Sequence, residues 1–155
     1  MAIARGTNGT KEGIVCATRG GESSRLVQME GIRLAAALDK PLIFIYVVDM
    51  AVMDEIDVGL KTAVHDELLW MGKTLLRIAQ RRAGMADLDA QLVIREGNVG
   101  EEISRFLRES EATVLLLGAP RGTTANIFGD DAIERFATSI QEESAVDVRI
   151  VYPET

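Results

Sequence analysis

The feature that most constrains the fold is an apolar run that breaks into a glycine-rich loop. Residues 113–117 read Thr-Val-Leu-Leu-Leu, and a run this apolar predicts a strand that is buried on both faces. It breaks at Gly118, continues through residues rich in glycine and threonine, and ends at Asp130 and Asp131 before a helical pattern. Strand, loop and helix start in this order are typical of the ligand-binding corner of an α/β protein, because loop amides and a helix N-terminus converge there.

Further strand-like runs alternate with helical patterns along the rest of the chain. The runs are at residues 14–17, 42–48, 90–95 and 146–151, which predicts a doubly wound α/β fold with a five-stranded parallel sheet and helices on both faces. The runs at 14–17, 42–48 and 113–117 are continuously apolar and therefore central, whereas the other two mix in polar residues and lie at the edges. Right-handed connections then favour the strand order 3-2-1-4-5.

This strand order predicts where a ligand would bind. The winding reverses between the first and fourth strands, so a crevice is expected beyond their carboxyl ends. Residues 18–24 would form one side of it and residues 118–131 the other.

The helices are predicted to bury one apolar stripe each. The helix ending near Leu38 has Gly31 in its middle, which costs about 1 kcal/mol against alanine and therefore favours a close approach to the sheet. Asn98 is expected to cap the helix that follows it. The longest helix, about 60–83, shows a regular stripe that we expect to face the core, made of Leu60, Val64, Leu68, Met71, Leu75 and Ile78.

Length and charge limit the domain organisation and the partners. A chain of 155 residues predicts one domain, here residues 12–155 after a flexible lead-in of residues 1–11. The net charge of -7 argues against nucleic acid and anionic membrane surfaces as partners. There is one cysteine, Cys16, and neither a signal peptide nor a membrane-spanning run is seen, so the prediction is a cytoplasmic protein without membrane insertion.

Four segments in order resemble one known family. They are residues 14–24, the run ending Tyr46-Val47-Val48-Asp49, residues 95–103, and the stretch from Leu115 to Gly129. Together they resemble a universal stress protein over about residues 12–152. The resemblance implies a Rossmann-like fold. It also implies a homodimer, often joined through the last strand, which here is 146–151.

The resemblance also exposes departures from the pattern of the members that bind ATP. Those members carry an Asp at the end of the first strand, where this chain has Arg19. Gly122 comes one residue later than the pattern, Gly129 comes two residues early, and Asp130 replaces a Ser or Thr. A carboxylate at Asp130 would face phosphate oxygens, and like charges at short range repel. The expectation is that no cofactor binds in the standard way, with ATP and magnesium as the alternative.

The candidate ligand-contacting residues lie on both sides of the predicted crevice. Arg19 could bind an anion together with Arg121, but the favoured interpretation is that it pairs with Asp130 or Asp131 and closes the pocket. Either way, Arg19 should lie within reach of residues 118–131. The full set is Thr18, Arg19, Gly20, Val47, Gly118, Arg121, Gly122, Gly129 and Asp130.

Other residues that could bind a metal or a partner are better explained by structural roles. Asp130 and Asp131 could hold a divalent metal, but an Asp before a helical pattern more often caps it. His65 is expected to be solvated, and Cys16 to be a small core residue. Trp70 and Met71, with the connection around Met53, could offer a surface to a partner, but core filling and a lid are favoured.

Three functions remain after these arguments. The favoured one is a homodimeric binding or regulatory protein that presents its crevice or helical surface to an unknown protein or small ligand without turnover. The alternative is an adenine-nucleotide sensor that uses loop 118–131. A slow phosphohydrolase that uses Asp130, Asp131 and a metal is less favoured, because the sequence offers no positioned base or nucleophile.

Overall fold

The computed structural model of the chain describes residues 12–19, 21–119 and 132–152. The predicted lead-in, residues 1–11, lies outside this part. Within it, five parallel strands form one sheet in the order β3-β2-β1-β4-β5, which confirms the predicted topology. The strands are β1 (Ile14–Ala17), β2 (Leu42–Asp49), β3 (Ala90–Gly97), β4 (Val114–Gly118) and β5 (Asp147–Val151).

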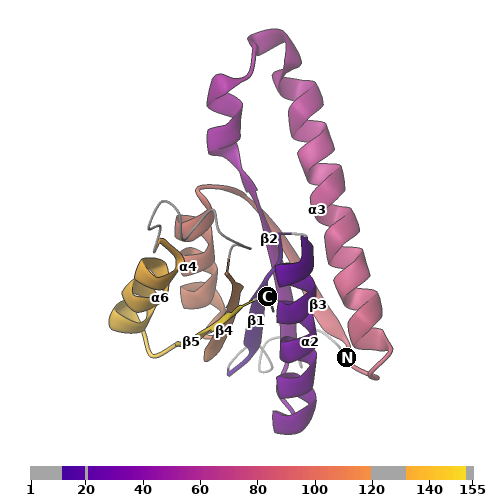
Figure 1. Cartoon of the computed structure of the whole chain (residues 1–155), viewed down its shortest axis with the longest axis vertical. Helices are drawn as coiled ribbons and strands as arrows, with labels where there is room; N and C mark the ends of the chain where they lie inside the picture. The colour runs from indigo at the N-terminus through magenta and orange to yellow at the C-terminus, as the bar shows by residue number, and fades with distance from the viewer. Residues whose placement is uncertain (1–11, 20, 120–131, 153–155) are drawn as a thin grey trace.

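Helices cover both faces of this sheet, as the doubly wound prediction requires. One face carries α2 (Gly21–Leu38) and α3 (Lys61–Gly84), and the other carries α4 (Val99–Ser110) and α6 (Ala132–Glu143). Two short 3-10 helices, η1 (Met50–Glu55) and η2 (Val58–Leu60), connect β2 to α3. In Figure 1, α3 lies on the side of the molecule opposite α4 and α6, and its first half extends past the sheet beside η1.

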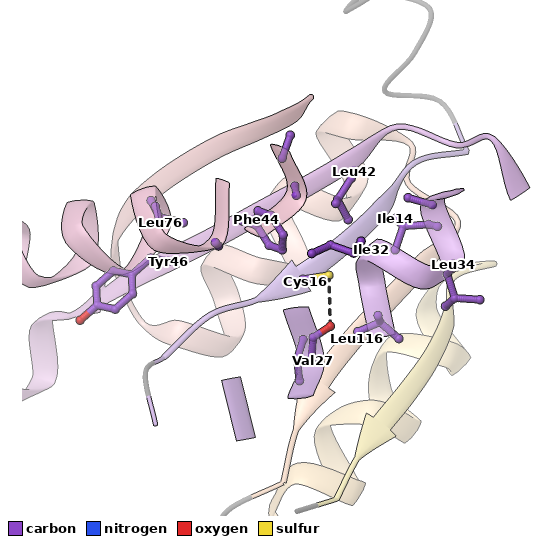
Figure 2. Close-up of a cluster of buried hydrophobic side chains, with 14 of the residues drawn as sticks. Ile14, Cys16, Val27, Ile32, Leu34, Leu42, Phe44, Tyr46, Leu76 and Leu116 are labelled. Carbon is purple, nitrogen blue, oxygen red and sulfur yellow. Dashed lines mark hydrogen bonds between the residues drawn. The ribbon is translucent and has the colours of Figure 1, made fainter. Parts of the chain in front are cut away.

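The core has two halves because successive residues of a strand point to opposite faces. Cys16 and Phe44 pack beneath α2 and α3, together with Val27 of α2 (Figure 2). Val15 and Ile43 pack beneath α4 and α6. The central strands are therefore buried on both faces, which is why their sequences are continuously apolar.

Local predictions for α2 and α4 are largely confirmed. Gly31 is buried against the sheet, and the helix ends at Leu38, as predicted. The Asn98 side chain accepts a hydrogen bond from the Glu101 backbone N at 2.9 Å, which is the predicted N-cap.

The prediction for α3 is only partly confirmed, because Leu68 and Leu75 of the predicted stripe pack against the core whereas Leu60, Met71 and Ile78 are exposed. The buried residues are Gly72, Leu76, Ala79 and Ala83 rather than the regular stripe that begins at Leu60. The reason is close approach, since a Cβ atom on Gly72 would fall 2.5 Å from Cδ1 of Tyr46 in β2. Small side chains are needed there, and the larger apolar stripe is displaced to the flank of the helix.

Of the residues in the connection and in α3 that were expected to fill the core, some are buried and others are exposed. Met53 is buried, as expected. Trp70 is 65% exposed and Met71 is also exposed, so core filling is wrong for both. Both residues lie on the side of α3 that is exposed to solvent.

Candidate functional site

The candidate site lies where β1 and β4 end side by side. β1 pairs with β4 through Cys16 and Leu116, and with β2 through Ala17 and Ile45. The chain leaves β1 towards α2 on one face and reaches β4 from α4 on the other, so the winding reverses between these two strands. This is the place that the sequence predicted for a ligand crevice.

Arg19 connects the two strand ends. Its backbone N donates a hydrogen bond to Oγ of Ser24 at 2.7 Å, which ties the end of β1 to the first turn of α2. Its Nη2 donates to the backbone carbonyl of Gly118 at 3.3 Å. The guanidinium of Arg19 thus reaches from the end of β1 to the last residue of β4, and it is exposed to solvent.

Several of the predicted site residues lie outside the described part of the chain. Gly20, Arg121, Gly122, Gly129 and Asp130 belong to this group, as does Asp131. The expected ion pair between Arg19 and Asp130 or Asp131 therefore stays a prediction. What the structure gives is the contact of Arg19 with Gly118, the first residue of that loop.

Thr18 brings a buried hydroxyl to the same place. Its side chain is 1% exposed, and its backbone N donates to the carbonyl of Ile45 at 2.8 Å. Its Oγ1 has no hydrogen-bond partner among the residues that the structure describes. A buried hydroxyl in that state costs about 1–3 kcal/mol, which makes it a candidate for contact with a ligand.

Val47 contributes backbone rather than side-chain chemistry. The pairing of β1 with β2 ends at Ala17 and Ile45, whereas β2 continues to Asp49. Alternate residues of a strand direct their peptide groups to the same neighbour. Because the Ile45 carbonyl faces Thr18, the peptide groups of Val47 face the same side, just past the end of β1.

His65 lies in a second polar contact that the sequence did not indicate. It was expected to be solvated, but it is 28% exposed and its Nε2 lies 2.8 Å from Oε1 of Glu96. The contact joins α3 to the end of β3. Since the two residues are 31 positions apart, only the register of β3 under α3 could have revealed it.

Cys16 has the environment of a core residue, as predicted. It is fully buried, its Sγ lies 3.9 Å from the carbonyl oxygen of Val27, and burial raises the pKa of its thiol. Within the described ranges no three His, Cys, Asp or Glu side chains gather as metal ligands. In the same ranges, no helix has the length and apolarity that crossing a membrane would require.

The strand order and the two helical layers define a Rossmann-like α/β protein. The chain belongs to the universal stress protein family, whose sequence model matches residues 12–149. No curated protein sequence matches it.

Solved structures of other universal stress proteins share this fold. One from Burkholderia pseudomallei has 20% identity and a TM-score of 0.70, covering 92% of this chain and 96% of that one. UspA from Lactobacillus plantarum has 14% identity and a TM-score of 0.71, covering 91% and 98%. A universal stress protein in complex with cAMP has 19% identity and a TM-score of 0.64, covering 93% and 98%.

Proposed function

We propose that this universal stress protein acts by binding, as a cytoplasmic homodimer without turnover, and that it does not hold ATP as the nucleotide-binding members do. The observation that carries the proposal is the contact of Arg19 with the carbonyl of Gly118. A guanidinium only donates hydrogen bonds, whereas the carboxylate carried by the ATP-binding members only accepts them. The hydrogen-bonding polarity at the end of β1 is therefore the reverse of that in the ATP-binding members, which supports the proposal that ATP is not held as it is in them.

The homodimer is proposed to form through β5. This strand is at one edge of the sheet, and an edge strand presents unpaired peptide groups that a second strand can complete. Its side chains alternate between exposed and half-buried over residues 147–150. The crevice or a helical surface would then serve an unidentified protein or small ligand, and the net charge of -7 disfavours nucleic acid.

An adenine nucleotide is the second candidate ligand, with ATP and magnesium as its specific form. Two observations favour it: the solved universal stress protein in complex with cAMP, and the buried Thr18 hydroxyl that has no partner among the described residues. In this case Thr18, the peptide groups of Val47 and the loop that begins at Gly118 would contact the nucleotide.

Thermal unfolding with millimolar ATP and magnesium, AMP or cAMP separates the two candidates. A ligand at 100 times its dissociation constant stabilises by about 2.7 kcal/mol, which corresponds to a shift of several degrees in a domain of this size. We expect no shift with any of the three. A shift with ATP that is lost in Thr18→Val would overturn the proposal and support the second candidate.

The bridging role of Arg19 has its own test. Arg19→Ala should speed hydrogen exchange in residues 18–24 and 114–119, because the link between the two strand ends is lost. Arg108→Ala is the matched control, since it removes an exposed arginine from the last turn of α4. Equal exchange in the two variants would show that Arg19 does not hold the crevice.

A further inference from the structure

The longest helix, α3, has apolar residues on its exposed side as well as on the side that packs against the sheet. Its buried line runs through Gly72, Leu76, Ala79 and Ala83 and packs on β2 and β3. A second line, at spacings of three, four and seven, runs along its exposed side. We call this line the α3 outer face, and it consists of Leu60, Glu67, Trp70, Met71, Thr74, Ile78, Arg81 and Met85.

The large apolar residues of the α3 outer face are open to solvent. Leu60, Trp70, Met71 and Ile78 are all exposed, as is Met85 just after the helix. Apolar side chains that gather on one side and are rimmed by charges mark interaction surfaces. Tryptophan is among the residues that contribute most to binding at such surfaces. The α3 outer face therefore has the composition of an interface.

Charge on this part of the chain is divided along its length. Residues 50–67 hold five carboxylates and one lysine, a net charge of -4 with His65 neutral. Residues 68–84 hold Lys73, Arg77, Arg81 and Arg82 and no carboxylate, a net charge of +4. Asp66 and Glu67 lie on α3 itself, and the other three carboxylates lie in the connection before it. Two copies of α3 laid antiparallel would bring Asp66 and Glu67 of each copy to the basic half of the other.

We propose that the α3 outer face is a self-association surface, on which α3 of one copy packs antiparallel against α3 of a second copy. A two-fold axis near Gly72 would bring Trp70 and Met71 of the two copies together and set Glu67 level with Arg77. Both of these charged residues are exposed. The complementary charges orient the pairing, and they offset the repulsion between two chains that each carry a net charge of -7.

This surface is separate from the edge strand. α3 packs on β2 and β3, while β5 is at the opposite edge of the sheet from β3. Figure 1 shows the same separation, with α3 on one side and β5 beside α6 on the other. Pairing through α3 therefore does not compete with pairing through β5, and the two can be measured independently.

Trp70 supplies a local readout because it is the single tryptophan. The full-length chain is followed by tryptophan emission and by sedimentation velocity over a concentration series from low to high micromolar. We expect the emission to shift to shorter wavelength as the concentration rises, with a doubling of the sedimenting mass. High salt should weaken the association, because it screens the exposed charges.

Charge-reversed variants test the antiparallel arrangement. Asp66→Lys with Glu67→Lys, and separately Lys73→Glu with Arg77→Glu, should each raise the concentration needed for association by about tenfold or more. An equimolar mixture of the two variants should associate nearly as well as the wild type. Since restoration needs both variants folded, it excludes misfolding as the cause of the loss.

Glu142→Lys with Glu143→Lys is the matched control, because it reverses two exposed charges on α6. It should leave the emission series of Trp70 unchanged. An emission spectrum that does not depend on concentration would overturn the proposal. So would charge-reversed variants that associate like the wild type, or a mixture that fails to restore association. Each of these results leaves the ligand-binding proposal untouched.

Discussion

Gly31 of α2 and Cys16 of β1 lie so close together that a Cβ atom on Gly31 would fall 2.2 Å from Cys16 Sγ. The same atom would lie 3.4 Å from Cδ1 of Leu42. Cys16 is fully buried, and its Sγ already contacts the carbonyl of Val27, so it has little freedom to turn away (Figure 2). The backbone of α2 thus rests directly on the sheet at this point.

Replacing this glycine should destabilise the protein. Gly31→Ala gains about 1 kcal/mol of helix propensity, but overpacking a tight core costs about 1–3 kcal/mol. We expect the free energy of unfolding in urea to fall by about 1 kcal/mol. Gly84→Ala is the control, because nothing lies within 4 Å of its added Cβ, and it should not destabilise.

The cause of this loss can be checked by making room at the partner. Cys16→Ala removes the Sγ atom, so the Gly31→Ala substitution should cost less in that background than in the wild type. A double-mutant cycle measures the difference. Additive effects of the two substitutions would show that the clash with Cys16 is not the cause.

The sequence predicted the fold well where one physical rule dominated. Continuous apolar runs identified the central strands, and Gly31 indicated the close approach of α2. The prediction was only partly right for α3, because apolar residues lie on more than one side of that helix and periodicity cannot say which side packs most closely. The line that contains Gly72 packs most closely on the sheet, because a Cβ atom at position 72 would clash with the Tyr46 ring. Small residues contribute little hydrophobicity, so this line is easily overlooked.

The sequence predicted which strand ends meet at the candidate site, but it did not predict the Arg19 contact that the structure describes there. Strand order alone predicted that a crevice would lie at the ends of β1 and β4, and the structure confirms that order. Arg19 was matched with Asp130 or Asp131 because side-chain charges are visible in a sequence, and that pair stays a prediction because both lie outside the described residues. The contact that the structure describes is with the backbone carbonyl of Gly118. Backbone acceptors have no sequence signature, and the same holds for the peptide groups of Val47.

Removing the hydroxyl of Thr18 should stabilise the protein. Its Oγ1 is buried without a hydrogen-bond partner among the described residues, so Thr18→Val removes an uncompensated polar atom and keeps the shape of the side chain. We expect the free energy of unfolding to rise by about 1 kcal/mol. Thr18→Ser keeps the hydroxyl and loses the methyl group, and it should destabilise by about 1 kcal/mol. If valine destabilises instead, the hydroxyl has a partner in the folded protein.

Loss of the cap on α4 should destabilise the protein. The Asn98 side chain accepts from the Glu101 backbone N at 2.9 Å, so Asn98→Ala leaves that donor without its partner. We expect a loss of about 1 kcal/mol in chemical denaturation. Asn98→Asp keeps an acceptor oxygen at the same place and should retain most of the stability. Equal losses in the two variants would show that the cap is not what matters.

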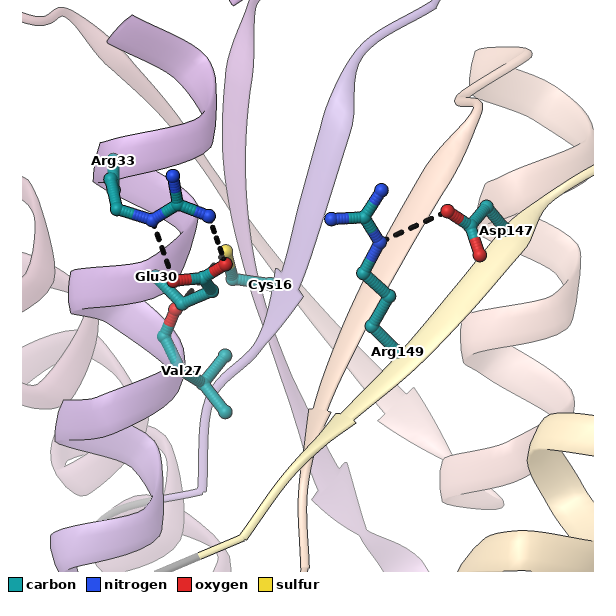
Figure 3. Close-up of polar contacts among 6 residues, drawn as sticks. All are labelled: Cys16, Val27, Glu30, Arg33, Asp147 and Arg149. Atoms are coloured by element: carbon teal, nitrogen blue, oxygen red, sulfur yellow. Dashed lines mark hydrogen bonds and ion pairs between the residues drawn. The ribbon is translucent and has the colours of Figure 1, made fainter. Parts of the chain in front are cut away.

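The ion pair of Glu30 with Arg33 should make stability depend on pH. Figure 3 shows both contacts between the two side chains, at 2.6 and 2.9 Å. Hydrogen bonding from Arg33 holds the pKa of Glu30 below its ordinary value of 4.5, against the opposing effect of burial. The charges of Arg33 and of Arg149, itself paired with Asp147, lower this pKa further.

Because the pKa of Glu30 is lower in the folded chain, the unfolded chain takes up the proton more readily as the pH falls. The stabilisation is therefore complete above pH 4.5 and is lost as the pH falls through the folded pKa. The Glu30 side chain is 32% exposed, so solvent screening limits the effect to less than about 1 kcal/mol. Glu30→Gln should be less stable than the wild type at neutral pH, and the difference should vanish in acid. Glu142→Gln, an exposed control on α6, should show no such trend, and a Glu30→Gln difference that persisted in acid would rule out the ion pair as its source.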